Sequence, residues 1–424
     1  MNRANAIANQ VVAPNSVHGV QGHASAKVGE KNDNDAVICC TLRTALCKNK
    51  KGSFKDTPPE ELLAACYEAI VQKTKIDPAL IQDAQIGNVL QGGAGAMAAR
   101  IAQFMAKYPA NTSAVAVNRQ CSSGLQCIAN VSAAITAGHY DVAIAGGVES
   151  MSMNSMMDTI NPKNLSEKIF DTEGAQACLI PMGITSENVA AKYNIPRAKQ
   201  DALALSSHQK ALKAQAEGLY DEEIIPVTVT LKDKKAGTEK QITVTKDEGP
   251  RPGVKIEDLA KLGPAFQKGG TTTAGNSSQT TDGAAMCLIA SRKKAKELGL
   301  PIVGKMISFA VEGCPPDIMG IGPAVAIPSA LKKAGLTVND IDIFEVNEAF
   351  ASQATYSVEH LGIPAAKLNP KGGAIALGHP LGATGARMCA TLMPELKRQN
   401  KKLGVISMCI GSGMGAAGVF EREY

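Results

Sequence analysis

Short apolar runs alternate with longer stretches of helical periodicity along most of the chain. The runs at 36–40, 142–147 and 403–407 are short and lack polar alternation, which is typical of strands buried on both faces. The stretch at 58–73 repeats its apolar side chains at helical spacing, and a further strand is predicted at 83–89. Strands that alternate with helices predict an α/β fold whose sheets are covered on both faces.

The stretch at 125–137 indicates how these layers are stacked. Apolar or small side chains point in every direction around it, so this helix is expected between two layers, with no face for solvent. A second small-residue helix is predicted at 385–392, and a buried strand follows each of the two helices. This weak repeat predicts two related halves whose loop ends meet, which would bring Cys121, His379 and Cys409 to one site.

The region between the two halves is more polar than its flanks. It contains a helix pattern at 199–217 and a hairpin pattern, with strands at 227–231 and 241–245 on either side of a charged turn at 232–239. We interpret this region as an insertion that binds substrate.

Composition excludes several classes of function. Of the 424 residues, 45% are hydrophobic and 20% are charged, as in an ordinary globular protein. The net charge of +5 is mild and only 4% of residues are aromatic, so a nucleic-acid-binding surface is not expected. No apolar run in the sequence reaches the length of a membrane span. The 11 cysteines are scattered, without the spacing of a zinc site, which indicates reduced intracellular thiols and no metal centre.

Cys121 is the first candidate for chemistry. It lies where an extended apolar run turns into the helix pattern, so it is expected at the positive end of a helix dipole. We expect that position to favour the thiolate, which is the nucleophilic form. At an ordinary thiol pKa of about 8.5 only a few per cent would be ionised at neutral pH, so a nucleophile here also needs a base.

His379 is the candidate base. It stands between Gly378 and Pro380, in a loop that these neighbours would hold in one conformation. Two acids and an amide at 345–348 follow a strand predicted at 341–344. They could position a water or a histidine, and they could equally begin a helix.

The glycine-rich runs do not match nucleotide-binding motifs. The run at 92–95 lacks the third glycine of a dinucleotide-binding fingerprint, and the run at 411–415 is followed by no helix and acid. Such glycines can instead let backbone N–H groups point into a site, as an oxyanion hole requires. The polar turn at 273–279 suits contact with an amide-rich ligand, and it also suits an ordinary loop.

Several of these segments together resemble the thiolase family, and within it the 3-ketoacyl-CoA thiolases of peroxisomes. They occur in the family's order between residue 36 and the end of the chain, at 118–124, 146–151, 181–188, 347–350, 378–380 and 409–411. The resemblance implies an acyltransferase of the five-layered αβαβα fold, built from two similar halves with an inserted loop domain. It implies cleavage of 3-oxoacyl-CoA by CoA in fatty-acid β-oxidation, through an acyl-cysteine intermediate.

The resemblance also implies roles for individual residues. Cys121 would attack the 3-keto carbon with His379 as its base, and Cys409 would serve as a second acid and base. Asn347 would hold a water in one oxyanion site together with His379. The backbone N–H groups of Cys121 and Gly411 would form the other oxyanion site.

Coenzyme A is implied as a co-substrate, with no permanently bound cofactor. Ser278 matches the family's pantetheine-contacting serine, Arg251 matches an arginine on the nucleotide side, and Met182 matches a residue of the acyl pocket. Members of the family are homodimers or tetramers, so a homodimer is expected. Ser412 stands where the family commonly has glycine, and we expect this change to be tolerated.

The matched motifs predict a division of the chain into five parts. These are a flexible tail at 1–35, a first half with the nucleophilic cysteine at 36–157, a loop domain that binds CoA at 158–275, a return segment to the first half at 276–300, and a second half with the histidine and the second cysteine at 301–424.

The tail carries a degenerate form of a peroxisomal targeting nonapeptide. The segment at 3–11 has the expected arginine and glutamine, but Ala4 and Val11 depart from the pattern. The resemblance therefore implies a peroxisomal location and an import receptor as partner, with a mitochondrial or cytosolic location as the alternative.

Three alternative functions stay open. An acetoacetyl-CoA thiolase, which joins two acetyl-CoA molecules, differs in the length of its acyl pocket, and the segment at 178–182 resembles the long-chain group instead. A decarboxylating ketoacyl synthase would have a second histidine in place of Asn347. A non-catalytic acyl-CoA-binding relative would not need Cys121, His379 and Cys409 together.

Overall fold

The computed structural model describes residues 26–156, 162–233 and 237–423. The targeting segment expected at 3–11 and the domain boundary expected at 157 lie outside these described residues. Within the described ranges, no helix is both long and apolar enough to cross a membrane.

The first half of the chain forms a mixed sheet. Its strands are β1 (Ala36–Arg43), β2 (Cys47–Lys48), β3 (Asp83–Gly87), β4 (Val115–Val117), β5 (Val142–Ser150) and β8 (Thr281–Ser291). β3 is parallel to β4 and β5, whereas β8 runs antiparallel to β5 and β1. The sheet order is therefore β4-β3-β5-β8-β1, with β2 beside β8. β5 and β8 are buried along their whole length, as expected for strands covered on both faces.

The second half repeats this arrangement. Its strands are β9 (Gly304–Gly313), β10 (Ile343–Val346), β11 (Leu403–Ile410) and β12 (Met414–Arg422). β10 is parallel to β11, and β12 runs antiparallel to β11 and β9, so β10-β11-β12-β9 repeats the directions of β3-β5-β8-β1. A short antiparallel contact between β1 and β9 joins the sheets. The prediction of two similar halves is confirmed.

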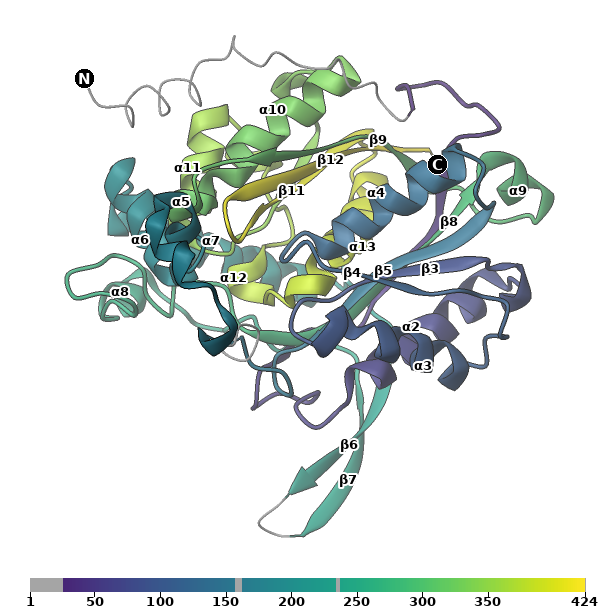
Figure 1. The fold of residues 1–424 in the computed structure, drawn as a ribbon, viewed down its shortest axis with the longest axis horizontal. Helices are drawn as coiled ribbons and strands as arrows, with labels where there is room; N and C mark the ends of the chain where they lie inside the picture. The colour runs from purple at the N-terminus through teal and green to yellow at the C-terminus, as the bar shows by residue number, and fades with distance from the viewer. Residues whose placement is uncertain (1–25, 157–161, 234–236, 424) are drawn as a thin grey trace.

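Two helices lie between the sheets (Figure 1). They are α4 (Ser123–Thr136) and α13 (Thr384–Arg398). Their first turns touch closely, because a Cβ on Gly385 would lie 2.2 Å from the backbone nitrogen of Leu125. The small side chains that the sequence places around these helices therefore allow the two sheets to approach, and the predicted buried helix is confirmed.

Outer helices complete five layers in the order αβαβα (Figure 1). One sheet is covered by α2 (Pro59–Thr74) and α3 (Ala96–Met105), and the other by α10 (Gly322–Ala334) and α11 (Ala351–Leu361). The short helices α9 (Arg292–Glu297) and α12 (Ala374–Leu377) lie in connections.

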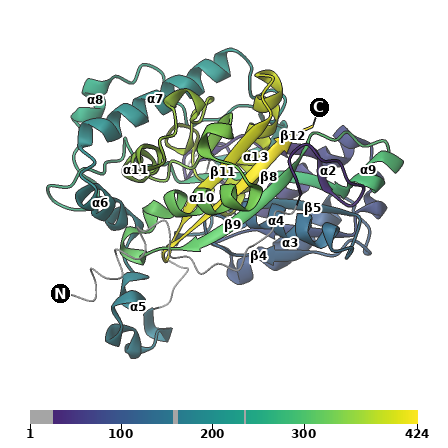
Figure 2. The same ribbon diagram turned by 90° about the horizontal axis from the view of Figure 1, so that it is seen from above.

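The inserted region packs its helices beside the second half (Figure 2) and its two strands against the first half. Its elements are α5 (Glu173–Ala177), α6 (Met182–Lys192), α7 (Arg197–Ala216), β6 (Val227–Asp233), β7 (Thr238–Val244) and α8 (Ile256–Ala260). β6 and β7 form the predicted antiparallel hairpin, which projects from the body of the protein (Figure 1). The division of the chain into the five parts given above stays a prediction.

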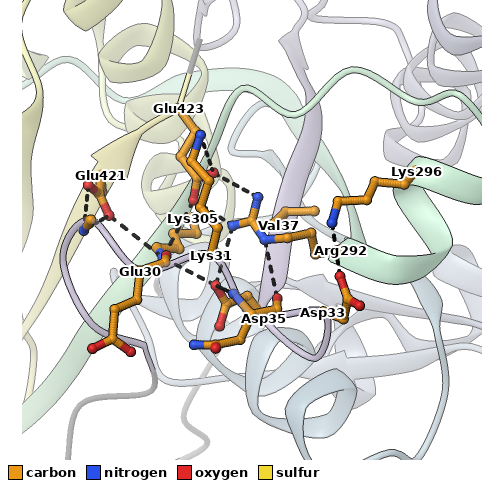
Figure 3. A network of polar contacts seen from close by, with 12 residues as sticks. Glu30, Lys31, Asp33, Asp35, Val37, Arg292, Lys296, Lys305, Glu421 and Glu423 are labelled. Carbon is orange, nitrogen blue, oxygen red and sulfur yellow. Dashed lines mark hydrogen bonds and ion pairs between the residues drawn. The ribbon is translucent and has the colours of Figure 1, made fainter.

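A buried ion network joins the two halves close to the β1–β9 contact (Figure 3). The ammonium of Lys305 on β9, with a fully buried side chain, lies 3.2 Å from Asp35, 3.7 Å from Glu421 and 3.5 Å from Glu423. Arg292 binds Glu423 at 2.6 Å and Asp35 at 3.3 Å. The network thus ties the start of β1 to the end of β12, on the opposite sheet.

Replacement of Lys305 is expected to destabilise this junction strongly. Lys305→Met leaves three buried carboxylates without their shared cation, and loss of one partner from a buried pair typically costs about 3–5 kcal/mol. The measurement is the urea-unfolding midpoint. Lys296→Met, which removes a solvent-exposed pair with Asp33, is the matched control and should unfold close to the wild-type midpoint. Equal effects of the two variants would contradict the prediction.

Candidate active site

Cys121 lies in the loop that joins β4 to α4, two residues before the helix begins at Ser123. Gln120 has a φ of 47°, in the left-handed region, which makes the chain turn sharply at this point. The loop closes through a hydrogen bond from the N–H of Ser122 to the carbonyl of Arg119 at 3.2 Å. The predicted position of the thiol at the start of a helix is confirmed.

The surroundings of this thiol disfavour its charged form. Burial raises the pKa of Cys121 to about 11, and the carboxylate of Glu149 acts in the same direction. Hydrogen bonds from the N–H groups of Gly411 and of Cys121 itself lower the pKa, but by less than burial raises it. The N–H groups at the helix end thus favour the thiolate as expected, but burial outweighs them, and the thiol of the resting protein needs a base. A Cβ on Gly411 would lie 2.1 Å from the Gln120 side-chain oxygen, so a side chain here would displace the end of Gln120.

His379 lies in the buried loop after α12, and its backbone and ring are both held. Its N–H donates to the carbonyl of Gln279 at 3.0 Å and to the hydroxyl of Thr281 at 3.2 Å. Its ring nitrogen Nδ1 lies 2.7 Å from the hydroxyl of Thr384, and Nε2 lies 3.4 Å from the side-chain nitrogen of Asn347. Because an amide nitrogen can only donate, Nε2 is assigned as the acceptor and Nδ1 as the protonated nitrogen.

Burial keeps this imidazole neutral. The pKa of His379 falls to about 3, chiefly through burial and also through the positive charge of Arg387. Nε2 is therefore unprotonated at neutral pH, and it can accept a proton in place of its 3.4 Å hydrogen bond from Asn347. Asn347 beside it is fixed by its own N–H, which donates to the carbonyl of Ser407 at 2.9 Å. Its buried side-chain oxygen has no hydrogen-bond partner among the described residues, so it can accept a bond from a ligand.

Cys409, at the end of β11, is buried in an apolar cluster with Met319 and Ala349. Burial raises the pKa of this thiol well above its ordinary value, and Cys121 raises it further. The side-chain nitrogen of Gln120, which precedes Cys121, donates to the hydroxyl of Ser412, three residues after Cys409, at 3.3 Å. The tertiary structure therefore brings both predicted cysteines into one site, and the N–H of Gly411 with them.

Close backbone contacts place the histidine loop against the cysteine helix. A Cβ on Gly124, in the first turn of α4, would lie 2.9 Å from the carbonyl oxygen of Gly382. A Cβ on Gly147, in β5, would lie 2.1 Å from the same oxygen. Only glycine allows this approach, which joins the loop of the second half to the cysteine half.

Glu149 is a site residue for which the sequence analysis predicted no role. It accepts hydrogen bonds of 3.0–3.2 Å from the side chain of Asn88 and from the N–H groups of Val89, Leu90 and Gly382. This buried carboxylate therefore holds the histidine loop of one half to the other half. Its place in the matched segment 146–151 was the one signal in the sequence that could have identified it. Thr384, which binds the ring of His379, was also missed.

The three residues expected to contact CoA or its acyl chain lie in two separate regions of the structure. Met182 packs against the cluster around the second thiol, and the N–H of Ser278 donates to the carbonyl of Ala349 in that cluster at 3.0 Å. Arg251 is exposed and lies against His208, to whose ring nitrogen its N–H donates at 3.3 Å. Burial, and then the charge of Arg251, lowers the pKa of His208 to about 4.

Comparison with known proteins identifies the family. The model for the thiolase N-terminal domain matches residues 36–293, and the model for the C-terminal domain matches residues 300–422. The chain is 58% identical over 398 residues to peroxisomal 3-ketoacyl-CoA thiolase A of Rattus norvegicus, covering 94% of this chain and 91% of that protein. It is 52% identical over 423 residues to the peroxisomal 3-ketoacyl-CoA thiolase of Yarrowia lipolytica, covering 100% of both. The dimeric peroxisomal thiolase of Saccharomyces cerevisiae matches with a TM-score of 0.86 and 47% identity, over 93% of this chain and 99% of that chain. The chain therefore belongs to the thiolase family, as its motifs predicted.

Proposed function

We propose that this protein is a 3-ketoacyl-CoA thiolase, an acyltransferase that cleaves 3-oxoacyl-CoA with CoA to acetyl-CoA and a shortened acyl-CoA. The observation that carries the proposal is one buried site with two thiols, the N–H of Gly411 at the first thiol, and a neutral histidine in an adjacent loop. A site that only bound acyl-CoA would not need two thiols and a histidine together. Relatives over 94% of the chain bear the same name.

The first half-reaction forms an acyl-enzyme. The Cys121 thiol loses its proton to Nε2 of His379, and the sulfur attacks the 3-keto carbon of the substrate. The bond between C2 and C3 then breaks with its electron pair on C2. Cys409 donates a proton to that carbon, which releases acetyl-CoA and leaves an acyl thioester on Cys121.

The second half-reaction returns the enzyme to its starting state. The Cys409 thiolate takes the proton of the incoming CoA thiol, whose sulfur attacks the acyl thioester. The bond to Cys121 breaks, and the Cys121 sulfur regains its proton from His379. The products are a shortened acyl-CoA and the free enzyme.

Hydrogen-bond donors would stabilise the oxyanions of both steps. We assign the N–H groups of Cys121 and Gly411 to one oxyanion, because both already point at the reactive sulfur. We assign His379, together with a water held by Asn347, to the other. Each such donor is typically worth about 10²–10³-fold in rate.

Coenzyme A would extend from the exposed Arg251 to the cluster around Cys409, where Ser278 and Met182 lie. We assign its pantetheine to Ser278, its nucleotide to the exposed Arg251, and the acyl chain to the pocket at Met182. CoA acts here as a co-substrate and not as a resident cofactor.

The test of this function is CoA-dependent thiolysis of 3-ketoacyl-CoA substrates of increasing chain length. Formation of acetyl-CoA from medium and long chains is expected. Activity confined to acetoacetyl-CoA would assign the protein to short-chain acetyl transfer instead, and no activity at any length would leave only acyl-CoA binding.

We propose a peroxisomal location, supported by the peroxisomal thiolases to which the chain is similar and by the degenerate signal at 3–11. An import receptor would bind this segment. A fluorescent protein fused to residues 1–35 should enter peroxisomes. Retention of the fusion in the cytosol would contradict the proposal.

We also propose that the protein is a homodimer joined through the edge of its first sheet. β4 is the last strand at that edge, with β3 as its one neighbour among the described strands. An apolar patch lies beside it, formed by the exposed side chains of Met97, Ile101, Phe104, Met105 and Val115. An unpaired edge next to exposed apolar surface is typical of a protein interface. The related yeast thiolase is described as dimeric.

A charge in this patch is expected to separate the subunits. Phe104, which is 51% exposed, would be buried in the dimer, and Phe104→Asp should weaken dimerisation about a hundredfold because it removes an aromatic contact and buries a charge. The measurement is molar mass by light scattering over a dilution series. Phe170→Asp, at a phenylalanine outside the patch that is 67% exposed, is the control and should stay dimeric. An unchanged mass for Phe104→Asp would contradict this interface.

A further inference from the structure

Gln279 makes contacts with two segments that are far apart in the sequence. Its side-chain nitrogen donates to the carbonyls of Gly249 at 3.0 Å, Ala376 at 3.2 Å and Ile375 at 3.3 Å. Its own carbonyl accepts the N–H of His379 at 3.0 Å. One half-buried residue thus contacts the segment before Arg251 and both ends of the turn that carries the catalytic histidine.

The two segments touch each other at the same point. A Cβ on Gly249 would lie 2.1 Å from the carbonyl oxygen of Ala376, so the backbones are in direct contact. α12 is a single turn, Ala374–Leu377; the N–H of Gly378 donates to the carbonyl of Ala374, but among the described residues no backbone N–H donates to the carbonyls of Ile375 and Ala376. Carbonyl oxygens that converge in this way repel one another unless a donor lies between them. The amide of Gln279 supplies that donor.

We propose that Gln279 is a positioning residue that couples the CoA-nucleotide segment at 247–251 to the placement of His379. The proposal rests on the proposed function, because it takes Arg251 as the nucleotide contact and His379 as the base. Removal of the amide would release the segment that carries Arg251 and the turn that carries His379 together. Both the KM for CoA and kcat then change through one side chain that touches neither the reacting atoms nor Arg251.

Gln215 provides a matched comparison. It is also half-buried, and its side-chain nitrogen donates to the carbonyl of Asp247 at 2.8 Å, in the same segment. No hydrogen bond joins its side chain to the turn at 374–379 among the described residues. Gln215→Leu therefore loosens the nucleotide segment alone.

The experiment compares Gln279→Leu with Gln215→Leu in steady-state thiolysis. For Gln279→Leu we expect kcat to fall about tenfold and the KM for CoA to rise about fivefold, as for the loss of a few shared hydrogen bonds. For Gln215→Leu we expect a similar rise in KM with kcat unchanged. Gln279→Asn has a shorter amide that cannot reach all three carbonyls, so its kcat and its KM for CoA should lie between those of the wild type and of Gln279→Leu. This variant serves as the test if Gln279→Leu does not fold.

Amide hydrogen exchange tests the same coupling without turnover. Gln279→Leu should speed exchange in peptides that cover both 247–251 and 374–381, whereas Gln215→Leu should speed it only in the first. The proposal is overturned if Gln279→Leu leaves kcat and the exchange of 374–381 at wild-type values, or if Gln215→Leu lowers kcat equally. A wild-type protein without thiolysis would refute the proposed function, while the exchange result would still decide whether Gln279 joins the two segments.

Discussion

Cys121→Ala is expected to reduce CoA-dependent thiolysis by at least about 10⁴-fold, because it removes the atom that forms the acyl-enzyme. The substitution deletes one sulfur from a partly buried loop position, so the fold should be preserved. The measurement is the initial rate of acetyl-CoA formation, together with the mass of the enzyme after incubation with a 3-ketoacyl-CoA in the absence of CoA. The wild type should gain one acyl group, and the variant none.

Cys66→Ala is the matched control for this loss. Cys66 is a fully buried thiol in α2, on the outer face of the first sheet, and its truncation should lower stability but leave kcat unchanged. Retained CoA binding by Cys121→Ala, measured by calorimetry, would show that the substrate site is intact. Turnover of Cys121→Ala at the wild-type rate would remove Cys121 as the nucleophile.

His379→Gln is expected to lower kcat by about 10²–10⁴-fold, because glutamine can form hydrogen bonds but cannot accept a proton. The loss of kcat in this variant should become smaller as the pH rises. Since the pKa of His379 is about 3, the wild-type base is already unprotonated throughout the neutral range. In the variant only preformed thiolate can react, and its fraction rises about tenfold per pH unit up to the pKa of Cys121 at about 11.

The measurement is kcat from pH 6 to about 10, within the range set by these pKa values. The variant should recover activity steeply with rising pH, whereas the wild type should change less. His360→Gln, at an exposed histidine that stacks on Tyr356, is the control and should match the wild type. A variant profile parallel to that of the wild type would mean that His379 is not the base for Cys121.

Local patterns in the sequence were sufficient to predict most of the elements. The helix predicted at 125–137 corresponds to α4 (Ser123–Thr136), and the strand predicted at 403–407 corresponds to β11 (Leu403–Ile410). Helical and strand periodicities depend on neighbours within a few residues, so a single sequence contains them. The absence of a polar face on α4 even indicated its position between two sheets, because a helix with no solvated face needs cover on all sides.

The site was predictable only in part. Cys121 and His379 could be selected by chemical type and loop context, and the family motifs supplied Cys409, Asn347 and Gly411. The direction of the Cys121 pKa shift could not be predicted, since it depends on burial by segments from both halves of the chain.

Glu149 and Gln279 escaped the residue-by-residue analysis for a related reason. In the sequence, Glu149 is an acid beside a strand and Gln279 is an amide in a polar turn, and neither differs from a solvated surface residue. Their roles come from hydrogen bonds to Gly382 and to Ala376, which lie in the other half of the protein.

The sequence by itself determined the α/β class, the two related halves and the family, and it supplied the candidate nucleophile. These features rest on side-chain chemistry and short-range periodicity, which do not change when the chain folds. The tertiary structure alone decided the protonation state of the site and the contacts that hold it together. Those depend on burial and on distances between residues remote in the chain, such as the approach of Gly124 to Gly382 at the junction of the two halves.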